Sequence, residues 1–221
     1  MGKTIGLKQL AQKTYTFIDG LADVISGSFG KLEDAFDVIF YGASGNGKSN
    51  CIAQFLMALL RALKCKAHYV AYEEGHGATI QEMLVHRHKM LEELGNVLQV
   101  TDHMTFEELE AAMAKRKSAK IWIIDSIQAA KFTADQCAEL KRKFVLSKKR
   151  KVIIYVSWSE GKFPQGAAAK SVEYYANIKV RVEGFIAFIR SRYGGNRNFI
   201  IWEEGAIKWW GRKLFNKHKD R

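Results

Sequence analysis

Proline and cysteine are both scarce in this 221-residue sequence, which contains one proline, Pro164, and three cysteines. With a single proline and no low-complexity linker, the sequence offers no clear boundary between domains. Cys51, Cys65 and Cys137 are far apart and form no Cys-x-x-Cys pair or Cys/His quartet. Neither a zinc ribbon nor a disulfide framework is therefore expected, and the cysteines are interpreted as small core residues.

Long apolar runs are also missing. No stretch approaches the roughly 20 apolar residues that a membrane helix needs, and the N-terminus lacks the apolar core of a signal peptide. We therefore expect no membrane partner and a reducing, cytoplasmic compartment. Acidic residues are outnumbered by basic ones, with 23 Asp and Glu against 35 Lys and Arg, which gives a formal net charge of +12. This surplus favours polyanionic partners, nucleic acid first, although a basic surface can also carry no function.

Short β-branched runs alternate with longer helical patterns, which is typical of an α/β fold. Near-continuous apolar runs such as 121–124 favour a mainly parallel central sheet with helices on both faces. The last strands are closely spaced and predict antiparallel hairpins at the C-terminal end. Strands are expected at 37–41, 67–72, 97–100, 120–125, 152–157, 178–183, 185–190 and 199–203. Helices are expected at 48–63, 78–94, 106–116, 134–147 and 167–175.

Three regions of the chain are distinguished. Residues 1–30 form an N-terminal segment of one or two helices, expected to pack on the core or on a neighbouring subunit. Residues 31–207 form the core, and residues 208–221 form a basic, aromatic tail. The basic run 148–151 is interpreted as a solvated helix end, and His86 and His88 as surface residues rather than ligands.

The pattern G-x-x-x-x-G-K-S lies directly after an apolar strand and directly before an amphipathic helix, a context that indicates a phosphate-binding loop. Glycines let such a loop curl so that its N–H groups face phosphates, and the helix adds its positive N-terminal end. Lys48 is expected to reach the β- and γ-phosphates of ATP, and the Ser49 hydroxyl to bind Mg²⁺. An ordinary glycine turn is the alternative. The predicted nucleotide-binding residues are Gly42, Ala43, Ser44, Gly45, Asn46, Gly47, Lys48, Ser49 and Asn50.

Carboxylates end two other predicted strands. Asp125 follows the run 121–124, at the sheet edge where ligands of open α/β sheets bind, and is a candidate Mg²⁺ residue opposite Ser49. A strand-end or helix-capping Asp is the alternative. Glu73 and Glu74 close the strand after the phosphate-binding loop, where a carboxylate can activate the attacking water. Neighbouring strand residues point in opposite directions, so only one is expected to face the site, and the spacing does not choose between them.

Several of these segments resemble the RadA/Sms family of RecA-like recombination ATPases. Residues 123–128 look like the family's Walker-B segment, and residues 69–74 are similar to its segment ending in Glu-Glu. This resemblance makes Glu73 the candidate catalytic base and Glu74 the second choice. It extends in order from about residue 39 to residue 205. The later similar segments are 159–161, 172–173, 182–184 and 190–194.

The resemblance also implies residues that act between subunits. In the RecA superfamily the basic residues of the last motif approach a neighbouring subunit's nucleotide, so Arg190 and Arg192 become candidate trans-acting cations. Arg190 and Ser191 replace the family's Lys and Asn, and two solvated strand arginines are the alternative. The family's zinc finger and Lon-like domain have no counterpart in these 221 residues.

Two basic segments are candidate nucleic-acid contacts. The RecA superfamily places a DNA-binding loop after the equivalent of strand 152–157, and here that position contains Lys162, Phe163 and Lys170. The tail interleaves aromatic residues with cations that include Arg212 and Lys213, a composition that can stack on bases and neutralise phosphates. Alternatively, the tail's tryptophans seal the core and its charges are only solvated.

Together these features predict an Mg²⁺-dependent, RecA-like ATP hydrolase that binds DNA, with single-stranded DNA preferred. It is expected to work as a homo-oligomer, either a ring or a filament, in recombination, repair or replication. The alternatives are a hexameric helicase or packaging-type motor, and a nucleotide-gated scaffold with little turnover. A small-molecule kinase is disfavoured because no lid domain or acceptor pocket is evident.

Overall fold

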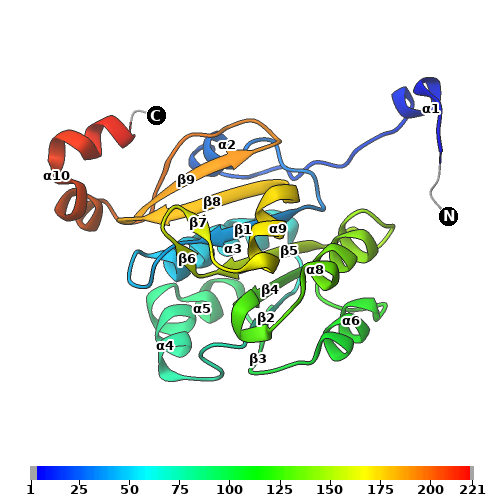
Figure 1. The fold of residues 1–221 in the computed structure, drawn as a ribbon, viewed down its shortest axis with the longest axis horizontal. Helices are drawn as coiled ribbons and strands as arrows, with labels where there is room; N and C mark the ends of the chain where they lie inside the picture. The colour runs from blue at the N-terminus through cyan, green and yellow to red at the C-terminus, as the bar shows by residue number, and fades with distance from the viewer. Residues whose placement is uncertain (1–3, 220–221) are drawn as a thin grey trace.

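The computed structural model describes residues 4–219. Residues 1–3 and 220–221, the outermost parts of the predicted N-terminal segment and tail, lie outside the described residues. Eight strands form one sheet in the order β10-β9-β8-β1-β5-β4-β2-β3 (Figure 1). The strands are β1 Asp37–Tyr41, β2 Ala67–Ala71, β3 Leu98–Thr101, β4 Ile121–Asp125, β5 Val152–Ser157, β8 Ile178–Glu183, β9 Ile186–Ser191 and β10 Phe199–Ile200.

The sheet is parallel from β8 to β3 and antiparallel where β9 and β10 are added. β1 lies in the middle, between β8 and β5. The predicted fold class, a mainly parallel sheet with antiparallel strands at the C-terminal end, is therefore confirmed. A separate small hairpin of β6 (Ser159–Glu160) and β7 (Phe163–Pro164) follows β5.

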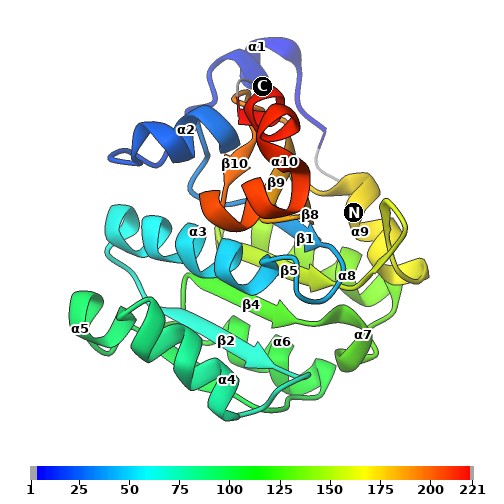
Figure 2. The same cartoon turned by 90° about the vertical axis from the view of Figure 1, so that its left-hand side faces the viewer.

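Helices cover both faces of the sheet, as predicted. On the face turned toward the viewer in Figure 2 lie α2 Asp23–Phe29, α3 Lys48–Leu63, α4 Ala78–Gln81, the π-helix η1 Glu82–Arg87 and α5 Met90–Leu94. The other face carries α6 Phe106–Ala114, α7 Ile127–Ala130, α8 Ala134–Leu140, the π-helix η2 Lys141–Val145 and α9 Ala167–Tyr175.

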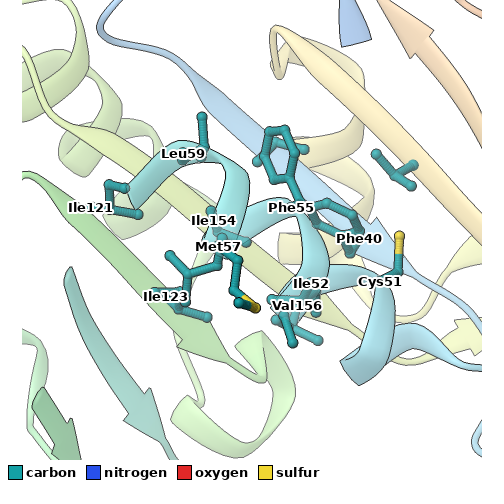
Figure 3. Packing of buried hydrophobic residues seen from close by; sticks show 14 of the residues in the cluster. Phe40, Cys51, Ile52, Phe55, Met57, Leu59, Ile121, Ile123, Ile154 and Val156 are labelled. Atoms are coloured by element: carbon teal, nitrogen blue, oxygen red, sulfur yellow. The ribbon is translucent and has the colours of Figure 1, made fainter. Parts of the chain in front are cut away.

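Successive strand residues point to opposite faces of the sheet and pack into two separate cores. Both faces are therefore apolar, which explains the continuous apolar runs in the strand sequences. In β1, Phe40 packs with the α3 side of the sheet, whereas Ile39 packs with the α8 side. Figure 3 shows Phe40, Ile123 and Val156 from three strands gathered around the side chains of α3. The sheet is thereby clamped between two apolar layers, and its strand ends are held in register.

Two predicted helices are interrupted. The expected helix 78–94 is divided into α4, η1 and α5, because Lys89 adopts a left-handed conformation with φ 47° that ends the first helical run. The expected helix 134–147 begins as α8 and continues as η2, which ends at Val145. The residue pattern indicated the helical periodicity correctly but not these changes of winding.

The C-terminal prediction was wrong in one respect. The expected strand 199–203 ends at Ile200, and α10 (Glu203–Lys219) takes in the described part of the predicted tail, with Gly211 in a non-helical conformation. Ala206 and Phe215 of this helix are buried against Ile186 of β9. These apolar residues of α10 therefore pack on the sheet, while its cations stay exposed.

The N-terminal segment is helical in two places. α2 packs on the core through Ile25 and Phe29, whereas α1 (Leu7–Ala11) has no buried residue and lies away from the rest of the molecule (Figure 1). Leu7 in α1 is 84% exposed. Within residues 4–219, no helix combines the length and the apolar character needed to cross a bilayer.

The interpretation of 148–151 as a solvated run was wrong for two of its residues. The Arg150 Nε donates a hydrogen bond to the Asp34 carboxylate at 3.0 Å. The Lys151 ammonium is buried and donates to the Ser118 hydroxyl at 2.8 Å and the Ala119 carbonyl at 2.6 Å. Burial lowers the pKa of Lys151 to about 8. Arg150 and Lys151 thus connect the segment after η2 to the residues that precede β1 and β4.

A buried ion pair anchors the start of the central strand. Asp37 is 0% exposed, and its Oδ1 accepts hydrogen bonds from the Lys141 ammonium at 2.9 Å and the Asn177 main chain at 3.0 Å. Lys141 also donates to the Tyr175 carbonyl at 2.7 Å. Burial raises the pKa of Asp37 despite the attraction of the Lys141 charge. The Asp37 carboxylate therefore depends on the Lys141 charge to offset the cost of its burial.

Replacing Lys141 by Met should destabilise the protein by about 3–5 kcal/mol, because it leaves a buried carboxylate without its counter-charge. Urea unfolding measures the change. The double variant Asp37→Asn/Lys141→Met is the matched control and should recover much of the loss. A Lys141→Met variant as stable as the wild type would contradict this account of the pair.

Candidate functional site

The loop 42–47 joins the central strand β1 to α3 at the carboxyl edge of the parallel strands. Gly45 and Gly47 adopt left-handed conformations with φ 77° and 91°. A methyl group on Gly47 would also lie 2.9 Å from the Phe185 ring. Because α3 begins directly afterwards at Lys48, its N-terminal amides face the space enclosed by the loop, an arrangement that binds anions.

Asn46 fixes this loop to the turn between β8 and β9. Its side-chain oxygen accepts a hydrogen bond from the Gly184 main chain at 2.7 Å, and its main-chain oxygen accepts one from Phe185 at 3.1 Å. The side-chain nitrogen donates to the Ser44 carbonyl at 3.2 Å. Asn46 was predicted from the motif as a binding residue. Its buried side chain fastens the loop to a distant part of the sheet.

The loop opens into a cavity of about 760 Å³ at the sheet edge. The predicted residues Gly42, Ala43 and Asn46 are not part of its lining. The predicted residues that line it are Ser44, Gly45, Gly47, Lys48, Ser49, Asn50, Glu73 and Asp125. Residues far apart in the sequence are thus brought to one space by the strand order β1-β5-β4-β2.

Asp125 is held at the inner wall by a residue that the sequence analysis missed. The Tyr69 hydroxyl donates a hydrogen bond to its carboxylate. Burial raises the pKa of Asp125 to about 6, opposed by the Tyr69 hydrogen bond and the Lys48 charge. Tyr69 lies two residues before Ala71, the register partner of Asp125. Only knowledge that β2 and β4 are neighbours would have identified it.

The donors around Asp125 fit a hard cation better than a soft one. Its carboxylate and the Ser49 hydroxyl line both the main cavity and a smaller adjoining one of about 220 Å³. Oxygen ligands suit Mg²⁺, which is commonly bound by one or two protein groups together with phosphates. Among the described residues, no cluster of three or more His, Cys, Asp or Glu forms a metal site by itself.

Both glutamates line the cavity, which corrects the expectation that only one would. β2 ends at Ala71, so Glu73 and Glu74 lie in a turn where strand alternation no longer applies. The Glu73 carboxylate accepts a hydrogen bond from the Trp158 indole at 2.7 Å. The Glu74 carboxylate accepts one from the Thr79 hydroxyl at 2.5 Å. The two acids are therefore tied to different parts of the chain.

Arg87 and His88 also line the cavity, although His88 was expected at the surface. The Asn50 side-chain oxygen lies 3.4 Å from an Arg87 nitrogen and 3.1 Å from His88 Nε2. Burial, and next the Arg87 charge, lower the pKa of His88. The π-helix η1 ends at Arg87 and brings this pair against the start of α3, a placement that helical periodicity alone did not indicate.

An aromatic wall forms another part of the cavity lining. The ring centroids of Phe185 and Trp202 lie 5.0 Å apart in an edge-to-face contact, and Ile201 also lines the cavity. The Gln54 amide of α3 donates to the Ile201 carbonyl at 3.1 Å. This wall comes from the turn between β8 and β9 and from the residues just after β10, and no sequence motif marked it. It presents aromatic and aliphatic side chains beside the phosphate-binding loop, and such side chains can pack against a planar ring.

The predicted trans-acting arginines lie outside this cavity. Arg190 of β9 extends beside α9, where it forms an ion pair with Glu173 at 2.8 Å. Arg192 is exposed just after β9. Both are therefore available to a neighbouring molecule and not to their own chain's cavity.

The predicted nucleic-acid residues fall into two groups, neither of which lines the cavity. Lys162 and Phe163 lie on the β6–β7 hairpin, where Phe163 is 61% exposed. The Lys170 ammonium of α9 lies 3.7 Å from the carboxylate of Glu160 on the same hairpin. Arg212 and Lys213 are exposed on α10.

Two solved structures share this architecture. The flagellar accessory protein FlaH from Methanocaldococcus jannaschii is similar over 80% of this chain and 88% of its own, with a TM-score of 0.58 and 19% identity. The KaiC-like protein PH0186 from Pyrococcus horikoshii OT3 is similar over 81% and 88%, with a TM-score of 0.55 and 18% identity. No protein-family model and no curated protein sequence matches. The chain therefore has the RecA-like P-loop ATPase fold.

The aromatic wall predicts a test of how a nucleotide is held. Trp202→Ala should weaken ATP binding about tenfold, because it removes an aromatic contact worth about 1.4 kcal/mol. Calorimetric titration measures the affinity. Inorganic tripolyphosphate, which has no base, is the matched probe and should bind both proteins within about twofold. Equal weakening of both ligands would show that Trp202 supports the loop rather than a base.

Proposed function

We propose that this protein is an Mg²⁺-dependent ATPase that binds single-stranded DNA and acts as a homo-oligomer in recombination, repair or replication. One observation carries the enzymatic part of the proposal. The phosphate-binding loop, Asp125 and Glu73 line the same cavity at the carboxyl edge of the sheet. That combination supplies an anion cradle, an oxygen ligand set and a candidate base within one space.

Each residue has a distinct role in the proposed reaction. Main-chain amides of the loop and the Lys48 ammonium hold the β- and γ-phosphates and neutralise charge that develops on them. Glu73 accepts a proton from the water that attacks the γ-phosphorus, and ADP leaves as the phosphoanhydride bond breaks. Ser49 and Asp125 would hold Mg²⁺. When bound, this ion neutralises charge on the phosphate oxygens.

The DNA-binding part rests on charge and exposure. The chain carries a formal charge of +12. On the hairpin, an exposed aromatic ring, Phe163, stands next to Lys162. Proteins commonly bind single-stranded DNA through this combination of a base-stacking ring and phosphate-neutralising cations. Arg212 and Lys213 on α10 supply a second cationic surface.

Two features support assembly into an oligomer. α1 exposes Leu7 and Leu10 away from the body of the protein, so this helix is available to a second copy. Arg190 and Arg192 lie outside their own cavity, and in the proposed assembly they would approach the nucleotide of a neighbour. Cations supplied in this way neutralise charge in the transition state of phosphoryl transfer. Both a ring and a filament satisfy these requirements.

A nucleotide-gated scaffold with little turnover is the second candidate. The observation that favours it is the Trp158 indole, which occupies one oxygen of Glu73 and so competes with water for the proposed base. FlaH, one of the similar structures, is described as a flagellar accessory protein. The same fold therefore occurs in a protein named for an accessory role.

Replacing each of the two glutamates by glutamine in turn distinguishes an ATPase from a scaffold with little turnover. Glu73→Gln should lower steady-state phosphate release at least about 100-fold, the usual contribution of a general base. Its ATP affinity should stay within about threefold, because the phosphate cradle is intact. Glu74→Gln is the matched control and should keep most of the activity. The reverse pattern would assign the base to Glu74, and equal activity in all three proteins would remove both residues from the chemistry.

Salt dependence tests the DNA-binding part. The affinity for an oligo-dT should fall steeply with added salt, with a log–log slope of about −0.7 for each phosphate neutralised. Lys162→Ala should make that slope shallower by about 0.7. Lys117→Ala, an exposed lysine beyond α6, is the control and should leave the slope unchanged. An affinity that does not respond to salt would exclude binding through phosphate contacts.

A further inference from the structure

The hydrogen bond between Trp158 and Glu73 joins two regions that the proposed function treats separately. The indole nitrogen lies 2.7 Å from the carboxylate oxygen, across 85 residues of sequence. Trp158 directly follows β5 and directly precedes the β6–β7 hairpin. The candidate base is therefore held by the residue from which the candidate nucleic-acid hairpin projects.

The position of Trp158 is set by Gln128, which lies three residues after Asp125. The Gln128 side-chain nitrogen donates to the Ser157 hydroxyl at 2.8 Å and to the Gln165 carbonyl at 2.6 Å. Its side-chain oxygen accepts a hydrogen bond from the Trp158 main chain at 3.3 Å. The Gln165 main chain donates back to the Trp158 carbonyl at 3.0 Å. One glutamine thus closes the base of the hairpin and connects it to the strand that carries Asp125.

The hairpin itself is lightly built. β6 and β7 contain two residues each and form a two-stranded sheet that is separate from the main sheet. A two-stranded hairpin of this size is marginally stable on its own, so a bound partner can shift it. Trp158 is 38% exposed and Glu73 is also exposed, so their hydrogen bond can exchange with water. A movement of the hairpin would therefore be transmitted to Glu73 at little energetic cost.

We propose that Trp158 is a positioning residue that restrains Glu73, and that single-stranded nucleic acid bound at the β6–β7 hairpin releases it. This inference rests on the proposed function and adds its regulation. In the restrained state the indole N–H occupies a carboxylate oxygen and fixes the direction of the side chain. Displacement of Trp158 frees that oxygen to accept a proton from water. The hydrogen bond is a latch, and its release makes turnover depend on nucleic acid.

Trp158→Phe tests the latch, because phenylalanine keeps the aromatic bulk and removes the N–H. Phosphate release without nucleic acid should rise about tenfold, the effect of one hydrogen bond to a charged group, and should approach the oligo-dT-stimulated rate of the wild type. Oligo-dT should then give little further stimulation. Oligo-dT affinity and ATP affinity, measured separately, should stay within about twofold of the wild type.

Two further variants keep the result interpretable. Gln128→Ala loosens the base of the hairpin and should also reduce the ratio of stimulated to basal rates. Tyr174→Phe on the neighbouring α9 removes an exposed hydroxyl and should behave as the wild type. Thermal unfolding of each variant checks that the fold is intact.

The outcomes distinguish this proposal from the proposed function. A wild type stimulated by oligo-dT, with Trp158→Phe stimulated equally, would overturn the latch and leave the ATPase standing. A fall in the basal rate of Trp158→Phe would show that the indole assists Glu73, which also overturns it. Raised basal release in a variant whose wild type ignores oligo-dT would exclude nucleic acid as the releasing ligand. No phosphate release from either protein would refute both proposals.

Discussion

The backbone of residues 42–47 is the constraint on which the rest of the site depends. Left-handed glycines turn the chain so that main-chain amides and the start of α3 face one point, and Lys48 adds its charge there. That geometry is maintained from outside, because Asn46 is hydrogen-bonded to the β8–β9 turn. The antiparallel end of the sheet therefore supports the loop proposed to bind phosphates, although it contributes no residue to the motif.

The site gathers its other groups through strand order. β5 separates β1 from β4, and β2 follows β4, so the carboxyl ends of these strands meet along one edge. Asp125 faces Lys48 across this edge, and their attraction opposes the burial that raises the carboxyl pKa. A buried carboxylate in this position is costly unless a cation compensates it. The arrangement therefore favours occupancy by a positively charged ligand at the same place.

Sequence reasoning succeeded where the signal was local. The strands around the phosphate-binding loop, the loop itself and the strand-end position of Asp125 follow from periodicity and a motif. It failed where residues are joined by tertiary packing. Tyr69, Trp158 and the aromatic wall beside Trp202 depend on which strands are neighbours and on where α10 packs, and neither is encoded in short spacing. The winding changes at η1 and η2 and the left-handed Lys89 were missed for the same reason.

The central claim is that the loop 42–47 and Lys48 bind the phosphates of ATP. Calorimetric titration of ATP with Mg²⁺ into the wild type and a Lys48→Ala variant tests it most directly. The wild type should bind ATP, and the variant should bind at least about 100-fold more weakly, because the phosphates lose their main side-chain cation in a confined site. Equal affinity in the two proteins, or no binding by a folded wild type, would contradict the account.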